Sequence, residues 1–396
     1  MSSDTRWSRS RRLLVWGGAC LAALMLVFYA AGGWYFSGLI DERALDGHAR
    51  RASLEPDYDL EVVAVDGTTV TIRLPEDPGS LTKEGVFGLR WADGSGRLGA
   101  IQTVTGDRVE RVFEVLEGQP PREGTAVQLL SRVFQGDPSA VGVAFEDVIV
   151  AGELGGYPAW FVDGPAKTWA VVVHGNSMTR EDGLRILPVL AEEGYPTLVI
   201  SYRNDPGAPE DPSGKLRYGA AEWRDLESAV RYALDGGARD VILVGFSMGG
   251  GIVASFLERS GLADSARAAI LEAPMLDFGR TVDDNASREE LPLVGLPLPS
   301  SLTAVAKWMA SLRFGVEWEE LDYLAHADEL DVPILLIHGE EDEDVPIATS
   351  EDLAERRPEL VTFVRVPVAA HMEAWNVDPR TYERTVATFL STVGSA

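Results

Sequence analysis

The pattern of apolar and polar residues divides the chain into three regions. Residues 13–40 form a continuous stretch without a charged side chain. From Tyr58 to about Val133, short β-branched runs alternate with Asp-Gly and Gly-rich turns, which is typical of antiparallel strands. From about Val143 onward, short apolar runs alternate with amphipathic stretches, and this rhythm predicts strands and helices in a mostly parallel sheet.

The first region predicts a transmembrane helix. A span needs about 20 apolar residues, whereas the apolar part of a signal peptide has about 7–15. We predict a cytoplasmic tail over 1–12, a transmembrane helix over 13–36 and a linker over 37–57. Four arginines precede the span, and Asp41 and Glu42 follow it. The positive-inside rule therefore predicts a single-pass cell-membrane protein with a cytoplasmic amino terminus and an extracytoplasmic body.

Cleavage of this segment as an export signal is the alternative. Residues 10–14 loosely resemble a twin-arginine signal, and cleavage would release the protein. The long apolar run and the lack of a clean Ala-x-Ala site favour a retained anchor.

The second region predicts a small all-β domain, a barrel or a sandwich, over residues 58–140. The expected strands lie at 60–65, 68–74, 86–91, 98–104, 109–116 and 125–134, with turns at Asp66-Gly67 and Asp93–Gly96. No cluster of His, Cys or carboxylates in this region has the spacing of metal ligands. We expect it to serve in packing or in spacing from the membrane, with ligand binding as the alternative.

The third region predicts an α/β domain over residues 143–396. Buried strands are expected at 168–173, 197–201, 240–244, 268–272, 333–337 and 361–366, and helices at 180–193, 220–234, 249–260, 349–357 and 379–393.

Candidate chemistry begins at the end of the 240–244 strand. There the chain runs into Gly245-Phe246-Ser247-Met248-Gly249 and then into a predicted helix. A Gly-x-Ser-x-Gly turn between a strand and a helix exposes a nucleophilic serine, because flanking side chains would collide with their neighbours. The helix amino terminus also favours developing negative charge. We predict Ser247 as the nucleophile.

A serine hydroxyl needs a base and an acid. Of the five histidines, His371 follows the last predicted strand in an irregular loop, where it can reach the carboxyl edge of the sheet. Several acids follow the 333–337 strand; we select Asp342, with Asp344 as the alternative. The chain order Ser247, Asp342, His371 is that of α/β-hydrolases.

An oxyanion hole needs two N–H donors. The backbone of Met248 is expected to supply one, since it follows the nucleophile. The loop after strand 168–173 supplies the other, and Asn176 is the candidate.

These motifs together resemble the α/β-hydrolase superfamily of serine esterases, lipases and S9-type peptidases. The resemblance covers about residues 143–393 and includes His174-Gly175, the Gly-x-Ser-x-Gly turn, the terminal His371, and a His-Gly-x-x-Asp-x-x-Val-Pro loop that aligns Asp342 with the family acid. It implies an α/β-hydrolase fold with a lid, here expected at 275–332. Tyr202 and Trp308 are the residues predicted to border the substrate.

Composition narrows the function. A net charge of −27 argues against nucleic-acid binding, and no metal or organic cofactor is expected. We predict a membrane-anchored serine hydrolase that cleaves a small-molecule ester, thioester or related acyl bond. The alternatives are an S9-like peptidase acting on peptide-like substrates and a non-catalytic cell-surface interaction protein. The oligomeric state is not indicated by the sequence.

Overall fold

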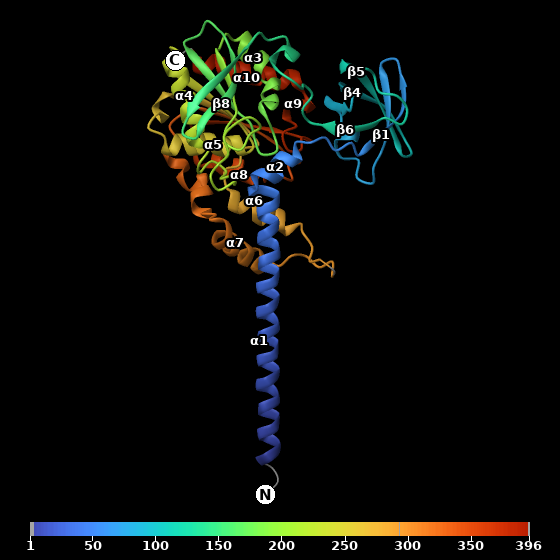
Figure 1. The fold of residues 1–396 in the computed structure, drawn as a ribbon, viewed down its shortest axis with the longest axis vertical. Helices are drawn as coiled ribbons and strands as arrows, with labels where there is room; N and C mark the ends of the chain where they lie inside the picture. The colour runs from blue at the N-terminus through green and yellow to red at the C-terminus, as the bar shows by residue number, and fades with distance from the viewer. Residues whose placement is uncertain (1–3, 293, 395–396) are drawn as a thin grey trace. The chain divides into compact units, whose positions relative to one another are not determined.

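The chain folds into two compact units. In the computed structural model, which describes residues 4–292 and 294–394 and their side chains from Leu14 onward, one unit comprises residues 1–45 with 282–318. The other comprises residues 46–281 with 319–396 and holds all of the β-strands among the described residues. Figure 1 shows the order of the elements along the chain.

Six antiparallel strands at the start of the larger unit close into a barrel. Their order around it is β1-β2-β5-β4-β3-β6. Apolar side chains at alternate positions, such as Val62, Leu89 and Leu98, fill its interior and are fully buried. Of the two predicted architectures, the barrel is confirmed. The strands are β1 (Leu60–Asp66), β2 (Thr69–Arg73), β3 (Phe87–Trp91), β4 (Gly94–Thr105), β5 (Arg108–Gly118) and β6 (Ala126–Leu130).

One predicted turn of the barrel is shorter than expected. The glycine-rich stretch Asp93–Gly96 was expected to be the turn, but β4 begins at Gly94, which pairs with Trp91. A side chain at Gly96 would approach the ring of Phe113 to 2.5 Å. Gly96 is therefore part of the strand and lets a large aromatic ring pack against the backbone.

The rest of the larger unit is built on an eight-stranded sheet. Its strand order is β14-β13-β12-β11-β9-β10-β8-β7. The six strands from β14 to β10 pair in parallel, and β8 and β7 are antiparallel additions. The strands are β7 (Glu146–Gly152), β8 (Gly155–Val162), β9 (Thr168–Val173), β10 (Thr197–Ile200), β11 (Asp240–Phe246), β12 (Ala266–Glu272), β13 (Ile334–Gly339) and β14 (Val361–Val366).

Helices flank this sheet and share its core. Leu187 and Leu190 of α3 and Val386 and Leu390 of α10 are buried in one cluster with sheet residues such as Val172. All six predicted strands and four of the five predicted helices are present, whereas the helix predicted over 180–193 is divided into a 3-10 helix over Arg180–Arg185 and the short α3. This arrangement confirms the α/β-hydrolase fold. The helices of the larger unit are α2 (Gly47–Ser53), α3 (Leu187–Glu192), α4 (Trp223–Asp235), α5 (Met248–Arg259), α8 (Ala348–Arg356), α9 (Ala374–Val377) and α10 (Pro379–Gly394).

The smaller unit is helical. It contains α1 (Asp4–Ile40) and α7 (Ser300–Phe314), which pack against each other, and α6 (Phe278–Ser287) enters it at its carboxyl end. Leu302 and Ala306 of α7 are buried in a cluster with Phe36 of α1. The middle of the segment predicted as a lid thus folds with the amino-terminal helix, and its role as a lid stays a prediction.

Candidate active site

Ser247 lies at the junction between β11 and α5 in a strained backbone conformation. Its φ of 51° and ψ of −118° lie outside the helix and strand regions. Three backbone hydrogen bonds hold it there: its N–H donates to Glu272 O at 3.0 Å, and its carbonyl accepts from Met275 N and from Gly250 N, each at 2.9 Å. The turn therefore directs the side chain out of the sheet at the carboxyl end of β11.

The glycines around Ser247 allow close backbone approach. A Cβ atom at Gly245 would come within 2.7 Å of Gly249 O, and one at Gly249 would clash with the carbonyl oxygen of Val173. A Cβ atom at Gly175 would come within 2.8 Å of Ser247 Cβ. Each glycine thus removes a collision, so that β9, β11 and α5 can meet directly beneath the serine.

The structure brings Ser247, His371 and Asp342 into one hydrogen-bonded chain. His371 Nε2 lies 2.9 Å from Ser247 Oγ, and His371 Nδ1 lies 2.7 Å from Asp342 Oδ2. Because a carboxylate only accepts, Nδ1 carries the proton and Nε2 is free to accept from the hydroxyl. The loops after β13 and β14 supply the acid and the imidazole, as expected from the chain order.

Asp342 is held as a buried anion. Its side chain is fully buried, and Oδ1 accepts from Val345 N at 2.8 Å and Asp344 N at 3.0 Å. Burial alone would raise the pKa of Asp342, but hydrogen bonds from His338 and His371 outweigh it and hold the pKa well below its usual range. The alternative acid, Asp344, is exposed and supports Asp342 through its backbone.

The charge of Asp342 also sets the basicity of His371. Burial opposes protonation of the imidazole, but the hydrogen bond to Asp342 and the nearby acidic charges raise the pKa of His371 above its ordinary value of 6.5. The neutral imidazole is the form that can accept a proton, and its fraction rises with pH.

His338 is a further residue of the site, beside the three predicted ones. It is fully buried at the end of β13, and its Nε2 lies 3.2 Å from Asp342 Oδ2 and 3.1 Å from Val345 O. Since the carbonyl only accepts, Nε2 carries a proton, and Nδ1 accepts from Ser350 Oγ at 2.7 Å. His338 is thus a positioning residue that contacts the same oxygen of Asp342 as His371 does.

One predicted oxyanion donor, Met248, directly follows Ser247, and the other, Asn176, follows Gly175, which packs against the serine. Met248 is the first residue of α5, and the first four N–H groups of a helix have no partner within it. Asn176 follows Gly175, whose Cα lies against the serine, and its side chain donates to Tyr218 Oη at 3.0 Å. Donation of the two backbone N–H groups to one oxygen stays a prediction.

Tyr202 does not border a substrate surface. Its side chain is fully buried, and its hydroxyl donates to Gly175 O at 2.9 Å. Its ring stacks on His174 at 4.4 Å between centroids. The prediction that Tyr202 contacts substrate is therefore corrected: the apolar strand before it carries it into the interior, where it supports the loop of Asn176.

A buried ion pair supports the same loop. Asp205 accepts from His174 Nε2 at 2.8 Å and pairs with Arg50 of α2 at 2.6 Å. Arg50 also donates to Met178 O at 2.9 Å. Burial would raise the pKa of Asp205, but these two partners lower it below its usual range. Part of the segment predicted as a linker is thus a buried element of the larger unit.

The remaining predicted residue, Trp308, lies on α7 of the smaller unit and is 60% exposed, and its contact with substrate stays a prediction. Among the described residues, no group of three His, Cys, Asp or Glu side chains is arranged to hold a metal ion.

Comparison with known proteins assigns the family. A family model described as "Alpha/beta hydrolase family" matches residues 170–385, which is more than half of the chain. The chain therefore belongs to the alpha/beta hydrolase family. A second model, a domain of unknown function (DUF8805), matches residues 61–129, which correspond to the barrel.

Individual relatives are distant. "Uncharacterized protein YqkD" of Bacillus subtilis (strain 168) is 23% identical over 57% of this chain and 72% of its own length. A non-heme haloperoxidase of Rhodococcus erythropolis is 26% identical over 46% of this chain and 77% of its own. Among solved structures, the Pyrococcus furiosus esterase Pf2001 has a TM-score of 0.52 and 18% identity, and covers 66% of this chain and 97% of its own. This likeness shows the fold.

The glycine packing beneath Ser247 gives a first prediction. Gly249→Ala places a methyl group against the carbonyl oxygens of Val173 and His174, which are backbone atoms that can move only with β9. We expect the free energy of unfolding to fall by about 1–3 kcal/mol, measured by denaturant unfolding of the detergent-solubilised chain. Gly261→Ala is the control, because a Cβ atom at this position meets open space, and it should change the free energy of unfolding little. Equal stability of the two variants would contradict the packing argument.

Proposed function

We propose that the protein is a serine hydrolase that cleaves carboxylic esters of small molecules through an acyl-enzyme on Ser247. The observation that carries the proposal is the chain of hydrogen bonds from Ser247 Oγ through His371 to the buried Asp342 carboxylate. A hydroxyl in this arrangement loses its proton to the imidazole as it attacks.

In the first half of the reaction, Ser247 Oγ bonds to the ester carbonyl carbon while its proton moves to His371 Nε2. The carbonyl oxygen becomes an oxyanion, which the N–H groups of Met248 and Asn176 and the amino terminus of α5 stabilise. His371 then donates its proton to the alcohol oxygen as the carbon–oxygen bond breaks. The alcohol leaves, and the acyl group stays on Ser247.

In the second half, water replaces the alcohol. His371 accepts a proton from water, the resulting hydroxide bonds to the acyl carbon, and the bond to Ser247 Oγ breaks as Oγ regains the proton. Asp342 stays ionised throughout and stabilises the imidazolium in both halves. Several of the similar solved structures are esterases by name, including the Pyrococcus furiosus protein, which agrees with an ester as the substrate.

Removal of the nucleophile is the direct test of this proposal. Ser247→Ala is expected to lower kcat for a short-chain 4-nitrophenyl ester by about 10⁴-fold or more, because no other group forms the acyl-enzyme. The control is Ser228→Ala, a half-buried serine on α4, which should keep the wild-type rate. A Ser247→Ala variant with wild-type turnover would overturn the proposal.

The pH profile gives a second test. Because His371 must be neutral to accept the proton and its pKa is raised, kcat/KM should fall on the acid side with a midpoint above 6.5. Asp342→Asn removes the charge that raises this pKa, whereas the burial that lowers it remains. We therefore expect the midpoint of Asp342→Asn to move to lower pH, together with a large loss of kcat. A midpoint unchanged by this substitution would show that Asp342 does not act on the base.

We further propose that α1 anchors the protein in the membrane with its amino terminus in the cytoplasm. Residues 14–45 include an 18-residue window of mean hydropathy 2.0 that is fully exposed. The 20 steps from Leu14 to Trp34 correspond to about 30 Å along a helix, the thickness of a bilayer's hydrocarbon core. A signal sequence has similar composition, so retention of the helix is the point to be tested.

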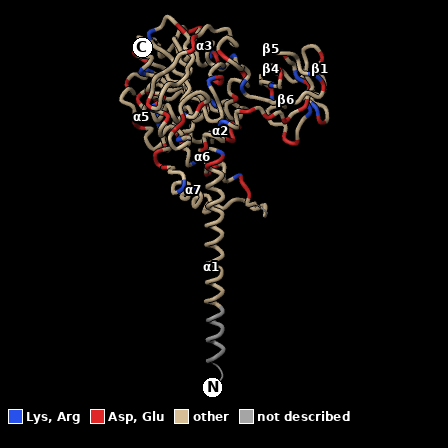
Figure 2. The backbone as a smooth tube through the Cα atoms, in the orientation of Figure 1, with Lys and Arg blue, Asp and Glu red and all other residues tan. Residues whose placement is uncertain are grey.

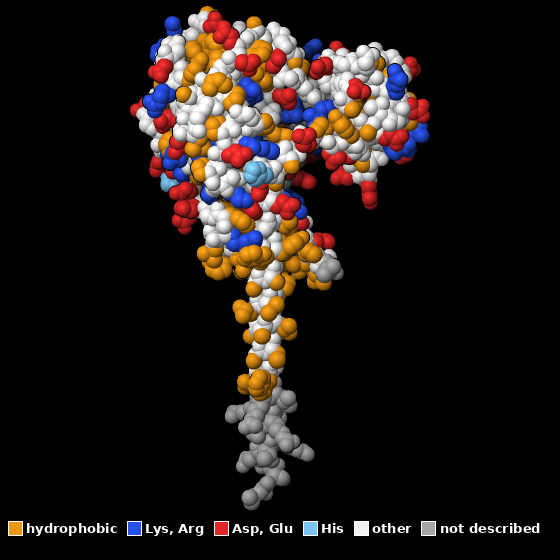
Figure 3. All heavy atoms as spheres, viewed as in Figure 1, with side chains coloured by type: hydrophobic (Ala, Val, Ile, Leu, Met, Phe, Trp, Pro, Cys, Tyr) orange, Lys and Arg blue, Asp and Glu red, His pale blue; other side chains and the backbone are white. Residues whose placement is uncertain are grey.

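Side chains at the outer end of this span fit a membrane interface. Arg313 of α7 lies over the ring of Trp34 at 3.7 Å and donates to Ser37 Oγ at 2.7 Å. Large apolar side chains of the same unit are exposed on both helices and on the loop before α7; these are Trp34, Tyr35, Val294, Leu296, Trp308 and Leu312. Figure 3 shows apolar side chains along α1, and Figure 2 shows no charged residue along the described part of its span.

The anchor is tested by substitution within the span. Leu21→Arg combined with Leu24→Arg should move the protein out of the alkali-resistant membrane fraction, since each arginine at a span centre costs about 2.5–3.5 kcal/mol. Leu21→Ala with Leu24→Ala keeps the apolar character and should stay in that fraction. A wild-type protein that is soluble and lacks residues 1–36 by intact mass would instead establish a cleaved signal.

A further inference from the structure

The barrel contacts the two loops that carry His371 and Asp342. The contacts come from residues 79–86, between β2 and β3, which we call the bridging segment. Ser80 Oγ donates to Glu373 Oε1 at 2.5 Å, two residues after His371. Lys83 Nζ pairs with Glu341 at 2.8 Å, directly before Asp342. The bridging segment thus touches both loops of the candidate active site.

A buried asparagine fixes the bridging segment to the loop of His371. Asn376 is fully buried, and its Nδ2 donates to Val86 O and to Ser131 O, each at 2.6 Å. Val86 N donates in return to Asn376 O at 2.8 Å. Gly85 has a φ of 135°, and a Cβ atom there would lie 2.6 Å from the same carbonyl oxygen. The backbone of the bridging segment is therefore in direct contact with both the side chain and the backbone of Asn376.

From within the barrel, Arg111 holds the other side of the bridging segment. Its side chain is buried in β5 and donates to the carbonyl oxygens of Ser80, Leu81 and Gly85 at 2.9–3.2 Å, and also to that of Gly99. Burial lowers the pKa of Arg111 to about 10, so it stays charged at neutral pH. The bridging segment is thus bonded to the barrel by Arg111 and to the hydrolase loops by Glu373 and Asn376.

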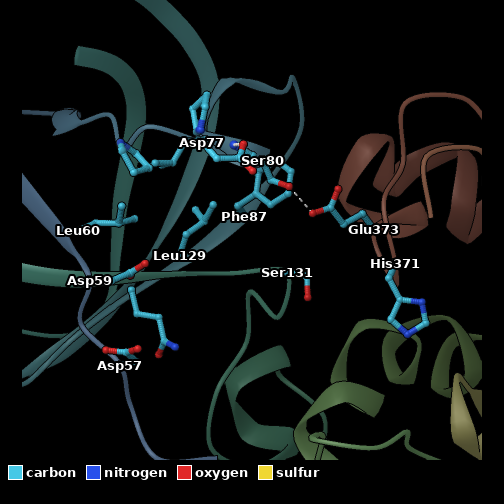
Figure 4. A pocket seen from close by; sticks show the side chains of 15 residues that line it. Asp57, Asp59, Leu60, Asp77, Ser80, Phe87, Leu129, Ser131, His371 and Glu373 are labelled. Carbon is cyan, nitrogen blue, oxygen red and sulfur yellow. Dashed lines mark hydrogen bonds between the residues drawn. The ribbon is translucent and has the colours of Figure 1, made fainter. Parts of the chain in front are cut away.

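A pocket lies between these two surfaces and ends at His371. Its volume is about 390 Å³, within the range of small-molecule sites. His371 and Glu373 line it from the hydrolase side, whereas residues such as Leu60, Phe87 and Leu129 line it from the barrel (Figure 4). One wall of the pocket is therefore the side chain that would hand a proton to the leaving alcohol.

We propose that the barrel completes the active site by forming the subsite for the alcohol portion of the ester. This inference rests on the proposed function. The proton that His371 delivers goes to the alcohol oxygen, so the group attached to that oxygen lies on the imidazole side of the reaction centre. His371 belongs to the lining of the pocket and Ser247 does not, so the alcohol portion would pass the imidazole to enter the pocket, whose two walls the bridging segment holds together.

The lining indicates which alcohols fit. Among the apolar lining residues, Leu60, Leu81 and Phe87 are buried in the barrel core, whereas Pro75, Pro78 and Leu129 are at least partly exposed and offer contact to a ring or an alkyl group. Asp57, Asp59, Asp77 and Glu373 are the charged residues of the lining apart from His371, and none of its fifteen residues is Lys or Arg. An alcohol that carries a carboxylate or a phosphate would be repelled. The subsite therefore suits an uncharged, partly apolar alcohol of small-molecule size.

The test is to fill the subsite and compare two esters of the same acid. Ser131→Trp adds a large ring at the pocket, and the backbone carbonyl that binds Asn376 remains. Gln128→Trp, in β6, also adds a large ring at the pocket and replaces Ser131→Trp in the experiment if that variant does not fold. The control is Gln102→Trp, at an exposed position of β4 that is not among the lining residues. Methyl butyrate and 2-naphthylmethyl butyrate are the substrates. For each ester, kcat/KM of the variant is divided by kcat/KM of the wild type.

In the filled variants, we expect the fold-decrease in kcat/KM for the naphthylmethyl ester to be at least ten times that for the methyl ester. The control should keep the wild-type kcat/KM for both esters. An equal effect on both esters would overturn the subsite while leaving the proposed function intact. Failure of the wild type to hydrolyse either ester, together with failure of Ser247 to react with a fluorophosphonate, would instead overturn the proposed function.

A matched pair of esters tests the charge of the subsite. Wild type should hydrolyse benzyl butyrate with a higher kcat/KM than 4-carboxybenzyl butyrate. Asp57→Asn combined with Asp59→Asn should lower the ratio of these two kcat/KM values about two- to fivefold, the size expected for exposed charges. A preference for the carboxylate ester would contradict the assigned class of alcohol.

Discussion

The candidate active site depends on a single buried charge. The Asp342 carboxylate is withdrawn from water, and a buried anion is tolerated only when hydrogen-bond donors surround it. His338, His371 and the backbone N–H groups of the following turn supply those donors. The loops after β13 and β14 must therefore hold one relative position, and this position brings the imidazole to Ser247. The arrangement of the site is a consequence of satisfying that carboxylate.

The parts of this arrangement that follow from local rules can be read from the sequence. A strand followed by Gly-x-Ser-x-Gly and a helix permits few conformations, so the place of Ser247 was predictable. Parallel strands end at the same edge of a sheet, which made His371 and Asp342 the natural partners among the histidines and acids. The barrel was predictable as all-β from its period-two runs. The turn before Gly94 was misplaced, because glycine occurs both in turns and where backbones pack closely, and the strand expected over 125–134 ends at Leu130.

The rest depends on contacts between distant segments, for which the sequence carries no local signal. Tyr202 looked like a residue at the mouth of a pocket, yet a stacked histidine and a carbonyl acceptor hold it in the interior. Arg111 and Asn376 are unremarkable polar residues of a strand and a loop in the sequence, and only the fold shows that they fix the barrel to the catalytic loops. Likewise, the insertion containing α7 folds with the amino-terminal helix by matching apolar surfaces.

Reaction of the full-length, detergent-solubilised protein with a fluorophosphonate, followed by peptide mapping, tests the central claim most directly. Such probes form a stable bond only with a serine whose hydroxyl is activated by a neighbouring base. The account predicts one adduct, on the peptide that contains Ser247, and its loss when His371 is replaced by alanine. A folded protein that remains unmodified, or an adduct on a different residue, would contradict it.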